Sequence, residues 1–326
     1  MRILTLLVLF SYGYNLYSQI NHSDVLPNLS GDQLLQELSN QYKPFFVLNF
    51  NNSRDTLFGV IYNENSTLTC VYSGHTISLD PNEDPTISAY QNGSSSGINT
   101  EHTFPRSKGA DNGAARADMH HLYPTRSKVN EARAADPFQQ IPDLETVRWY
   151  VQNQESNLIP TQNIDLYSED TNSEFEPKEA HKGNVARAMF YFYTMYKSEA
   201  DQADPEFFEK QRSTLCDWHW NDPVDSLEWV RNQMIATYQD GKVNPFILDC
   251  SLASRSYCDT STSCTTTSSQ DAFKNSLPIY PNLSSSNFSK NSNRQNVQGN
   301  IYSQVGKLIE TLNSLRQMTF LESAKP

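Results

Sequence analysis

NTEHTFPRSKGADNGAARADMHHLYPTRSKVNEARAADPF, the stretch from Asn99 to Phe138, gathers acid, imidazole, amide and guanidinium side chains more densely than any other part of the chain. Glu101-His102 stands near its start, Asp118-Met119-His120-His121 in its middle, and Asn130 with Arg133 near its end. Such groups hold divalent ions and move protons in catalytic sites. The stretch therefore indicates a metal-dependent catalytic site, and we expect the fold to form around it.

The pair Glu101-His102 suits hydrolysis of a phosphodiester, which needs a general base for water and a cation that neutralises the transition state. His102 fits the base, because an unperturbed imidazole, with a pKa of about 6.5, is largely neutral at pH 7. Glu101 and Asn130 offer the oxygen ligands that Mg²⁺ prefers, and Mn²⁺ or Ca²⁺ are alternatives. Adjacent residues on a regular strand point to opposite faces, so Glu101 and His102 converge only where the backbone bends.

The end of the stretch predicts a helix that begins at Pro124-Thr125. On it, Arg126, Asn130 and Arg133 would share one face. That face would present an amide to the metal and two guanidinium groups to phosphates. Arg126 and Arg133 are therefore predicted substrate contacts.

The central run has alternatives that the sequence leaves open. His120 and His121 could be zinc ligands, but neither an HExxH nor a CxxC pattern accompanies them. We expect one of them to pack inward and the other to line the cleft, without deciding which does so. Asp118 is expected to brace the segment by hydrogen bonds rather than bind the metal, and Arg116 to be solvated.

The net charge of −12 argues against a polyanionic partner, since nucleic-acid binders usually carry a basic footprint. The local balance differs, because between Arg106 and Arg133 six basic residues face three acidic ones. The acid is concentrated elsewhere, notably from Asp165 to Glu179. Local charge governs contact with a phosphate backbone, so the objection weakens.

The first residues predict export. Arg2, the apolar run Ile3–Phe10 and the small and polar residues that end at Gln19 have the order of a signal peptide. The run is too short for a membrane span, and no later segment approaches that length. Five cysteines in an exported chain favour one or two disulfides and leave at least one thiol outside them. Their spacing does not reveal the pairing.

The pattern before and after the site indicates a mixture of short elements. Ser30-Gly31-Asp32 predicts the start of an amphipathic helix. Strands are predicted for three runs rich in aromatic and β-branched residues, namely 45–50, 57–62 and 66–72. Residues 152–179 are polar and acidic and are predicted to form a long exposed loop.

Two further helices form the predicted scaffold. Residues 183–197 are apolar on nearly every side, which indicates a buried helix. Arg187 within it either forms a buried salt bridge or extends to the surface, or else contacts a phosphate. A structural role is favoured because a charge on a buried helix needs a partner. Asp222-Pro223 predicts the start of the next helix and Asp240-Gly241 its end. His219 is expected to be packed rather than to bind a ligand.

The chain resembles the endonuclease I family of secreted and periplasmic bacterial nucleases in four blocks, which occur in this order: EHTFPRS, DMHHLYPTRSKVNEARAADPF, KGNVARAMFYFYTMY and WHWNDPVDSLEWVRNQMIATYQDGKVNPF. The resemblance implies an α+β fold with a His-Me finger (ββα-metal) core. It also implies cleavage of DNA, and often RNA, with little sequence preference and 5′-phosphate products. His102 would be the general base, and Glu101 and Asn130 would hold the ion. Some members have an acid just before the Asp-x-His block, where this chain has Arg116.

The tail, from PIYPNLSSSNF to IYSQVGKLIETL, resembles the C-terminal sorting module of type IX secretion, which makes that machinery a possible partner. The match breaks down from Arg316 onward, so the module is incomplete. The expected organisation is a signal peptide (1–19), a nuclease domain (20–250), a Ser/Thr-rich linker (251–275) and a small β module (276–326). No internal repeat is visible.

The sequence thus predicts a secreted, metal-dependent, non-specific endonuclease. One alternative is a secreted metal-dependent phosphodiesterase or phosphatase that acts on small organophosphates. Another is a surface protein with an inactive nuclease-like core. Intact Glu101, His102 and Asn130 argue against the latter, because retained site chemistry says more about function than the fold does.

Overall fold

The computed structural model describes residues 23–259, 299–302 and 308–312. The chain divides into two compact units, Met1–Gln270 and Asp271–Pro326. The signal peptide predicted for residues 1–19 lies outside the described residues. None of the described helices is both long and apolar enough to cross a membrane.

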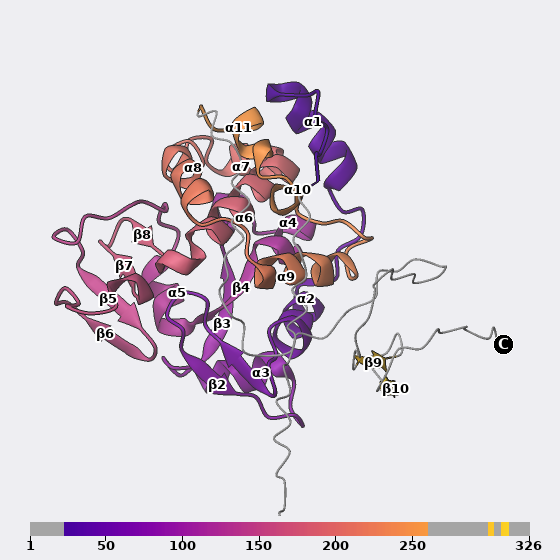
Figure 1. Cartoon of the computed structure of the whole chain (residues 1–326). Coiled ribbons are helices and arrows are strands. Elements are labelled where there is room, and N and C mark those ends of the chain that lie inside the picture. The colour runs from indigo at the N-terminus through magenta and orange to yellow at the C-terminus, as the bar shows by residue number, and fades with distance from the viewer. Residues whose placement is uncertain (1–22, 260–298, 303–307, 313–326) are drawn as a thin grey trace, which may run out of the picture. The chain divides into compact units, whose positions relative to one another are not determined.

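The first unit mixes short helices with small antiparallel sheets, which confirms the predicted α+β class (Figure 1). Its α-helices are α1 (Gly31–Tyr42), α2 (Phe50–Thr56), α3 (Pro85–Tyr90), α4 (Gly113–Ala117), α5 (Ser127–Arg133), α6 (Lys182–Met195), α7 (Lys197–Ala203), α8 (Arg212–Asn221), α9 (Ser226–Ala236), α10 (Pro245–Leu248) and α11 (Ser251–Ser256). Single turns of other helix types are η1 (Leu57–Ile61), η2 (Gln91–Gly93), η3 (Arg106–Lys108), η4 (Met119–His121), η5 (Ile164–Leu166) and η6 (Glu179–His181).

The strands of the first unit form three sheets. Their order is β1-β2, β3-β4 and β6-β5-β7-β8, with every pair antiparallel. The strands are β1 (Thr67–Thr69), β2 (Thr76–Ser78), β3 (Ile98–His102), β4 (Leu122–Arg126), β5 (Arg148–Val151), β6 (Gln154–Ser156), β7 (Ser168–Asp170) and β8 (Phe175–Glu176). In Figure 1 the four-stranded sheet lies to one side of β3 and β4, and α6 with its neighbours lies above them.

Helix α6 is the centre of the first unit, as the apolar run predicted. Every side chain from Val185 to Met195 is buried. Arg187 lies among them, and its Nε and Nη2 atoms pair with the Glu228 carboxylate of α9 at 2.8 and 2.7 Å. The favoured structural role of Arg187 is therefore confirmed as a buried ion pair, and this side chain is not available to a phosphate.

Two of the predicted strands before the site are wrong. Residues 45–49 form no strand, and Asn49 instead caps α2, its side chain accepting a hydrogen bond from the Asn52 amide. The helix continues into the π turn η1, which buries Leu57 and Phe58. Of the third predicted strand, 66–72, only Thr67–Thr69 forms a strand. A helix cap beside aromatic residues overrode their β propensity.

Residues 152–179 are not the predicted exposed loop. They supply β6, β7 and β8 and bury Glu169, Asp170 and Glu176. The Glu176 carboxylate accepts hydrogen bonds from the Ile141 amide and from Gln140 Nε2, and it pairs with Lys182. Acidic side chains that find such partners can be buried, so polarity alone mispredicted this sheet.

Helix α9 begins three residues later than predicted. Asp225 is its N-cap and accepts a hydrogen bond from the Glu228 amide at 2.7 Å. The Asp222 side chain instead accepts from the Gly183 amide at the start of α6, at 2.8 Å. His219 is packed as expected, and its Nε2 atom lies 3.0 Å from the Cys250 carbonyl oxygen.

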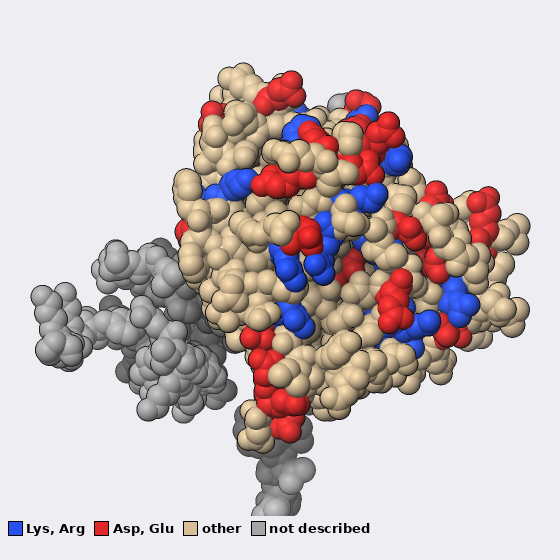
Figure 2. All heavy atoms as spheres, turned by 180° about the vertical axis from the view of Figure 1, so that it is seen from behind, with Lys and Arg blue, Asp and Glu red and all other residues tan. Residues whose placement is uncertain are grey.

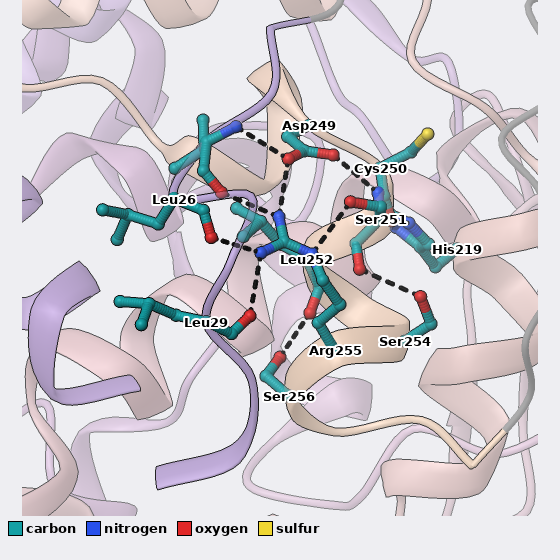
Figure 3. A network of polar contacts seen from close by, with 11 residues as sticks. Leu26, Leu29, His219, Asp249, Cys250, Ser251, Leu252, Ser254, Arg255 and Ser256 are labelled. Atoms are coloured by element: carbon teal, nitrogen blue, oxygen red, sulfur yellow. Dashed lines mark hydrogen bonds and ion pairs between the residues drawn. The ribbon is translucent and has the colours of Figure 1, made fainter. Parts of the chain in front are cut away.

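Arg255 on α11 clasps the N-terminal segment of the unit (Figure 3). Its Nη1 atom donates to the carbonyls of Leu26 and Leu29 at 2.8 and 3.1 Å. Its Nη2 atom donates to the Val25 carbonyl and to Asp249, both at 2.8 Å. The Asp249 carboxylate also accepts from the Val25 amide at 2.9 Å. The first and last described residues of this unit are thus joined.

The linker predicted for residues 251–275 is wrong in its first part. Residues 251–256 form α11, and Leu252 and Ala253 are fully buried. Ser254 and Ser256 fit the helix because each hydroxyl donates to a carbonyl oxygen three or four residues earlier. Residues 260–275 lie outside the described part of the chain.

One of the predicted disulfides is present, between Cys216 and Cys258. It links α8 to Cys258, the second residue after α11. Cys70 is a free, buried thiol, as the odd count of cysteines required. In the second unit, β9 (Gly299–Tyr302) and β10 (Leu308–Leu312) pair antiparallel, which agrees with the predicted β character of that segment.

We expect R187M to lower the free energy of unfolding by about 3–5 kcal/mol, because Glu228 would remain as an unpaired buried charge. The double variant R187M/E228M removes both charges and should regain most of that loss. Urea denaturation of both variants and the wild type measures the difference. A single variant as stable as the double one would contradict this account of α6.

Glu169 on β7 should make stability depend on pH. Burial raises its pKa to about 7, and Glu176 and Asp143 act in the same direction, while Thr146 and Lys182 oppose them. The folded state therefore favours the protonated acid, and stability is lost as pH rises from about 4.5 to 7.

We expect E169Q to be more stable than the wild type at pH 8 by roughly 1 kcal/mol, and equally stable at pH 4. Urea denaturation at the two pH values measures this, with E145Q at an exposed glutamate as the control. A stabilisation that is the same at both pH values would refute the titration of Glu169.

Candidate active site

The stretch from Asn99 to Phe138 folds into two strands and a helix. β3 pairs with β4 in an unbroken antiparallel register, from Ile98 opposite Arg126 to His102 opposite Leu122. The helix α5 follows directly and packs on both strands. The predicted helix start at Pro124 is wrong, because Pro124 is inside β4 and α5 begins at Ser127. A proline is tolerated there because β4 is an edge strand.

The two faces of β3 carry different groups. Asn99 and Glu101 share the face toward α5, where their partners are Asn130 and Arg133. Thr100 and His102 share the other face, toward α2 and α4. The backbone does not bend between Glu101 and His102. Their side chains therefore stay on opposite faces and do not converge, which the sequence had led us to expect only with a bend. Within the described residues no strand pairs with the other edge of β3. Both faces of the strand can therefore be reached from this open edge.

Glu101 is buried, with 2% of its surface exposed. Its Oε1 atom accepts a hydrogen bond from the Tyr72 hydroxyl at 3.1 Å and lies 3.2 Å from Arg133 Nε. Burial raises the pKa of Glu101, while the Arg133 charge and the Tyr72 hydrogen bond oppose that shift. No described residue bonds to Oε2, which leaves this oxygen available to a cation.

Arg133 holds Glu101 in place. The arginine is fully buried, and its Nη2 and Nη1 atoms donate to the carbonyls of Thr103 and Ala134 at 2.7 and 3.1 Å. Its guanidinium lies over the Phe138 ring, 4.6 Å from the centroid. Enclosed in this way, Arg133 supports Glu101 and does not reach a phosphate. The predicted phosphate contact is replaced by this anchoring role.

Asn130 is oriented by its amide nitrogen. Nδ2 donates to the Asn99 side chain at 2.5 Å and to the Thr100 carbonyl at 3.2 Å. The oxygen Oδ1 makes no hydrogen bond with the described residues, so it is the second free oxygen beside β3. An acid and an amide oxygen suit a hard cation that keeps several waters, as Mg²⁺ does. The described residues contain no group of three or more His, Cys, Asp or Glu side chains that could hold a metal.

His102 is poised to accept a proton. Its Nε2 atom lies 3.0 Å from the Arg116 carbonyl oxygen, which can only accept, so Nε2 carries the hydrogen. The lone pair is then on Nδ1, which has no partner among the described residues. Burial lowers the pKa of His102 well below its usual value, and His121, Arg106 and Arg116 act in the same direction. The imidazole is therefore neutral at pH 7, as a general base requires.

Asp118 braces the centre of the stretch. The tyrosine hydroxyls of Tyr191 and Tyr196 both donate to its Oδ2 atom at 2.8 Å. The His120 amide and Gln239 Nε2 donate to Oδ1 at 3.0 and 2.9 Å. All four bonds are internal to the protein, and the carboxylate is fully buried. The geometry gives Asp118 a supporting place, in agreement with the expectation.

His120 and His121 are both buried, so neither lines a cleft as one was expected to. Nε2 of His120 lies 3.0 Å from the Lys242 carbonyl, and Nε2 of His121 lies 2.8 Å from the Ala115 carbonyl. Burial lowers the pKa of each to about 4, so both are neutral. The His121 ring meets that of His102 edge-on, with 5.5 Å between centroids. His121 thus packs against His102, the predicted base.

Arg126, the other predicted phosphate contact, is the last residue of β4. Only 5% of it is exposed, and its Nε atom donates to the Ser95 carbonyl at 3.1 Å. Its Nη1 atom is buried and has no hydrogen-bond partner. The guanidinium is therefore only partly used by the protein, and contact with a phosphate stays a prediction.

Ion pairs neutralise part of the local excess of positive charge between Arg106 and Arg133. Arg106 pairs with Asp111 at 2.6 Å and Lys108 with Asp204 at 2.9 Å. Arg116 forms no ion pair with the described residues. Figure 2 shows one face on which Lys and Arg gather around a hollow despite the negative net charge.

Several supporting residues were missed from the sequence. Tyr72 bonds Glu101 from 29 positions away, and Arg231 on α9 donates to the carbonyls of Met119 and Leu122 at 2.6 and 2.9 Å. Phe50 lies against His102, with 5.3 Å between ring centroids. These contacts join segments far apart in the chain, and no spacing pattern signals them.

Comparison with known proteins places the chain in a family. The model of the family described as Endonuclease I matches residues 31–250. An extracellular ribonuclease of Bacillus amyloliquefaciens is 31% identical over 170 residues, which cover 48% of this chain and 53% of that protein. An extracellular ribonuclease of Bacillus subtilis (strain 168) is 30% identical over 162 residues, covering 46% and 50%. The match thus spans about half the length of these curated relatives. The chain belongs to the endonuclease I family.

Proposed function

We propose that this protein is a secreted, divalent-metal-dependent endonuclease that hydrolyses phosphodiester bonds of DNA and RNA without sequence preference and leaves 5′-phosphate ends. Glu101 and Asn130 hold the ion, and His102 is the general base. The pairing of β3 with β4 and the helix α5 that follows support a His-Me finger (ββα-metal) arrangement. Mg²⁺ is the proposed ion, with Mn²⁺ or Ca²⁺ as alternatives.

The observation that carries the proposal is the placement of the two functions on opposite faces of β3. In-line displacement at phosphorus needs the attacking water on one side and the departing oxygen on the other. His102 stands on one face of the strand, and the free oxygens of Glu101 and Asn130 belong to the other. A phosphodiester lying along the open edge of β3 would have the base and the ion on opposite sides.

The chain's own residues then perform the proton transfer and the positioning. His102 Nδ1 takes a proton from water, while the Arg116 carbonyl holds the ring through Nε2. A bound divalent ion supplies positive charge to the phosphate and to the departing oxygen. Arg133 and Tyr72 keep Glu101 oriented, and Asn99 does so for Asn130.

The relatives bear on substrate and location. Both are described as extracellular ribonucleases, which supports RNA as a substrate and supports export. Residues 1–19 would act as the signal peptide. Residues 276–326 would address the chain to the type IX secretion machinery, a part of the proposal that rests on the sequence resemblance alone.

We expect H102A to reduce the turnover of plasmid DNA and of RNA by roughly 10²–10⁴-fold, the usual contribution of a general base. Binding of an oligonucleotide should stay close to that of the wild type, because His102 acts on water. The melting temperature should fall, because the buried ring packs on Phe50 and His121. Turnover near the wild-type value in this variant would refute His102 as the base.

E101Q and N130A should raise the Mg²⁺ concentration needed for half-maximal activity about tenfold or more. E101Q removes the negative charge and one of the two carboxylate oxygens, and N130A removes the amide oxygen. The measurement is a Mg²⁺ titration of the cleavage rate. E131Q, at the exposed neighbour of Asn130 on α5, is the matched control. An unchanged titration in both test variants would exclude this pair as the ion site.

An assay with and without EDTA separates the proposal from its alternatives. Plasmid and RNA cleavage that EDTA abolishes supports the endonuclease. A preference for small phosphate esters over polymers would instead favour a phosphodiesterase or phosphatase. If neither nucleic acids nor small phosphate esters are hydrolysed with Mg²⁺, Mn²⁺ or Ca²⁺, an inactive surface protein is favoured.

A further inference from the structure

The guanidinium groups of two arginines beside His102 have no assigned ligand in the site as described so far. Arg54 lies on α2 and Arg116 on α4, and both guanidinium groups lie against the ring of Phe50, with Cζ 5.4 and 4.5 Å from its centroid. The Phe50 ring in turn packs on His102. Two positive charges from separate helices thus stand on the His102 face of β3.

Neither guanidinium has a counter-ion within 4 Å in the described part of the chain. Arg54 Nε donates to the Thr100 hydroxyl at 3.1 Å, which fixes it over β3 next to the catalytic pair. Arg116 is held through its backbone, whose carbonyl accepts from His102, and its Nε atom is buried without a hydrogen-bond partner. Both side chains are half-buried and therefore partly accessible to a ligand.

The nearest acids are already occupied. Asp55 and Asp84 act on Arg54 from a distance, but both accept hydrogen bonds from Thr86, and Asp84 also caps α3. Burial lowers the pKa of Arg54, Asp55 and Asp84 oppose that shift, and the smaller effect of the Arg116 charge adds to it. Asp55 and Asp84 thus act on the Arg54 charge only from a distance, without an ion pair within 4 Å.

A purely structural role explains this poorly. Contact of one guanidinium with an aromatic ring stabilises a protein only slightly at an exposed site, and a second like charge on the same ring works against it. The neighbouring Arg106 and Lys108 show the usual solution, since each has a carboxylate partner. An anion with several oxygens would neutralise two half-buried guanidinium groups that have no carboxylate partner.

We propose that Arg54 and Arg116 form a subsite for the phosphodiester group next to the one that is cleaved. This inference rests on the proposed function. The subsite lies on the His102 face of β3, so it receives the strand on the side from which water attacks. It reads a backbone phosphate and no base, which suits an enzyme without sequence preference.

The test uses R54Q, R116Q and the double variant in the full-length protein. Binding of a labelled oligonucleotide is measured in EDTA by fluorescence anisotropy over a range of salt concentrations. Each lost phosphate contact should lower the slope of log K against log[salt] by about 0.7–0.9. We expect the double variant to bind about 10–100-fold more weakly, with KM for the polymer raised in proportion and kcat changed less than about threefold.

The control variants separate this subsite from general charge and from folding. R148Q removes an arginine on β5 that is paired with Glu155, and its affinity should stay close to the wild type. R54K and R116K keep the charges and should regain most of the affinity. A dinucleoside monophosphate has no neighbouring phosphate, so R54Q/R116Q should raise its KM far less than that of the polymer.

The outcomes distinguish this inference from the proposed function. An unchanged salt slope in the double variant, in a protein that cleaves DNA normally, would overturn the subsite and leave the nuclease intact. A loss of kcat that is equal for the dinucleotide and the polymer would also overturn it, because the arginines would then act through His102. A wild type that binds the oligonucleotide through this pair but cleaves no nucleic acid would overturn the proposed function alone.

Discussion

The buried carboxylate of Asp118 is the interaction on which the candidate site depends. Burial alone would raise its pKa, but His120, Gln239 and His121 outweigh that effect and hold the pKa below its usual value. The charge is thus stabilised by donors from α6, from the end of α6 and from the turn after α9. Because such a carboxylate is costly to leave unsatisfied, it locks the segment before β4 onto the helical scaffold. Both strands of the site are positioned from this segment.

The composition of residues 99–138 predicts Glu101, His102 and Asn130 as the chemical centre, and the structure places all three on β3 and α5. The apolar run predicted α6. The partners that orient these residues could not be predicted, because they come from positions far along the chain. The pattern of polar and apolar residues also failed to predict elements in which a polar side chain is buried with a partner. Glu169 and Glu176 look like loop residues in the sequence, yet they belong to a sheet, and the helix start at Pro124 was wrong because β4 tolerates a proline at its edge.

The arginines illustrate the same limit. In the sequence they form one basic excess, and only the structure sorts them by what they touch. Arg133 and Arg187 are enclosed with carboxylate partners and stabilise the protein. Arg54 and Arg116 stand beside the base without such partners. Charge patterning therefore indicated that the segment favours a polyanion, but not which side chains remain free to meet one.

The clasp between Arg255 and residues 25–29 also constrains when the protein can become active. Synthesis delivers the catalytic stretch early, but Asp118 then lacks Tyr191, Tyr196 and Gln239, and the amino-terminal segment lacks α11. The nascent chain can complete its core only after Arg255 has left the ribosome or the translocation channel. If the chain is exported while still unfolded, as proposed, residues 99–138 leave the cell before the contacts of Asp118 and Arg255 hold them in the folded arrangement.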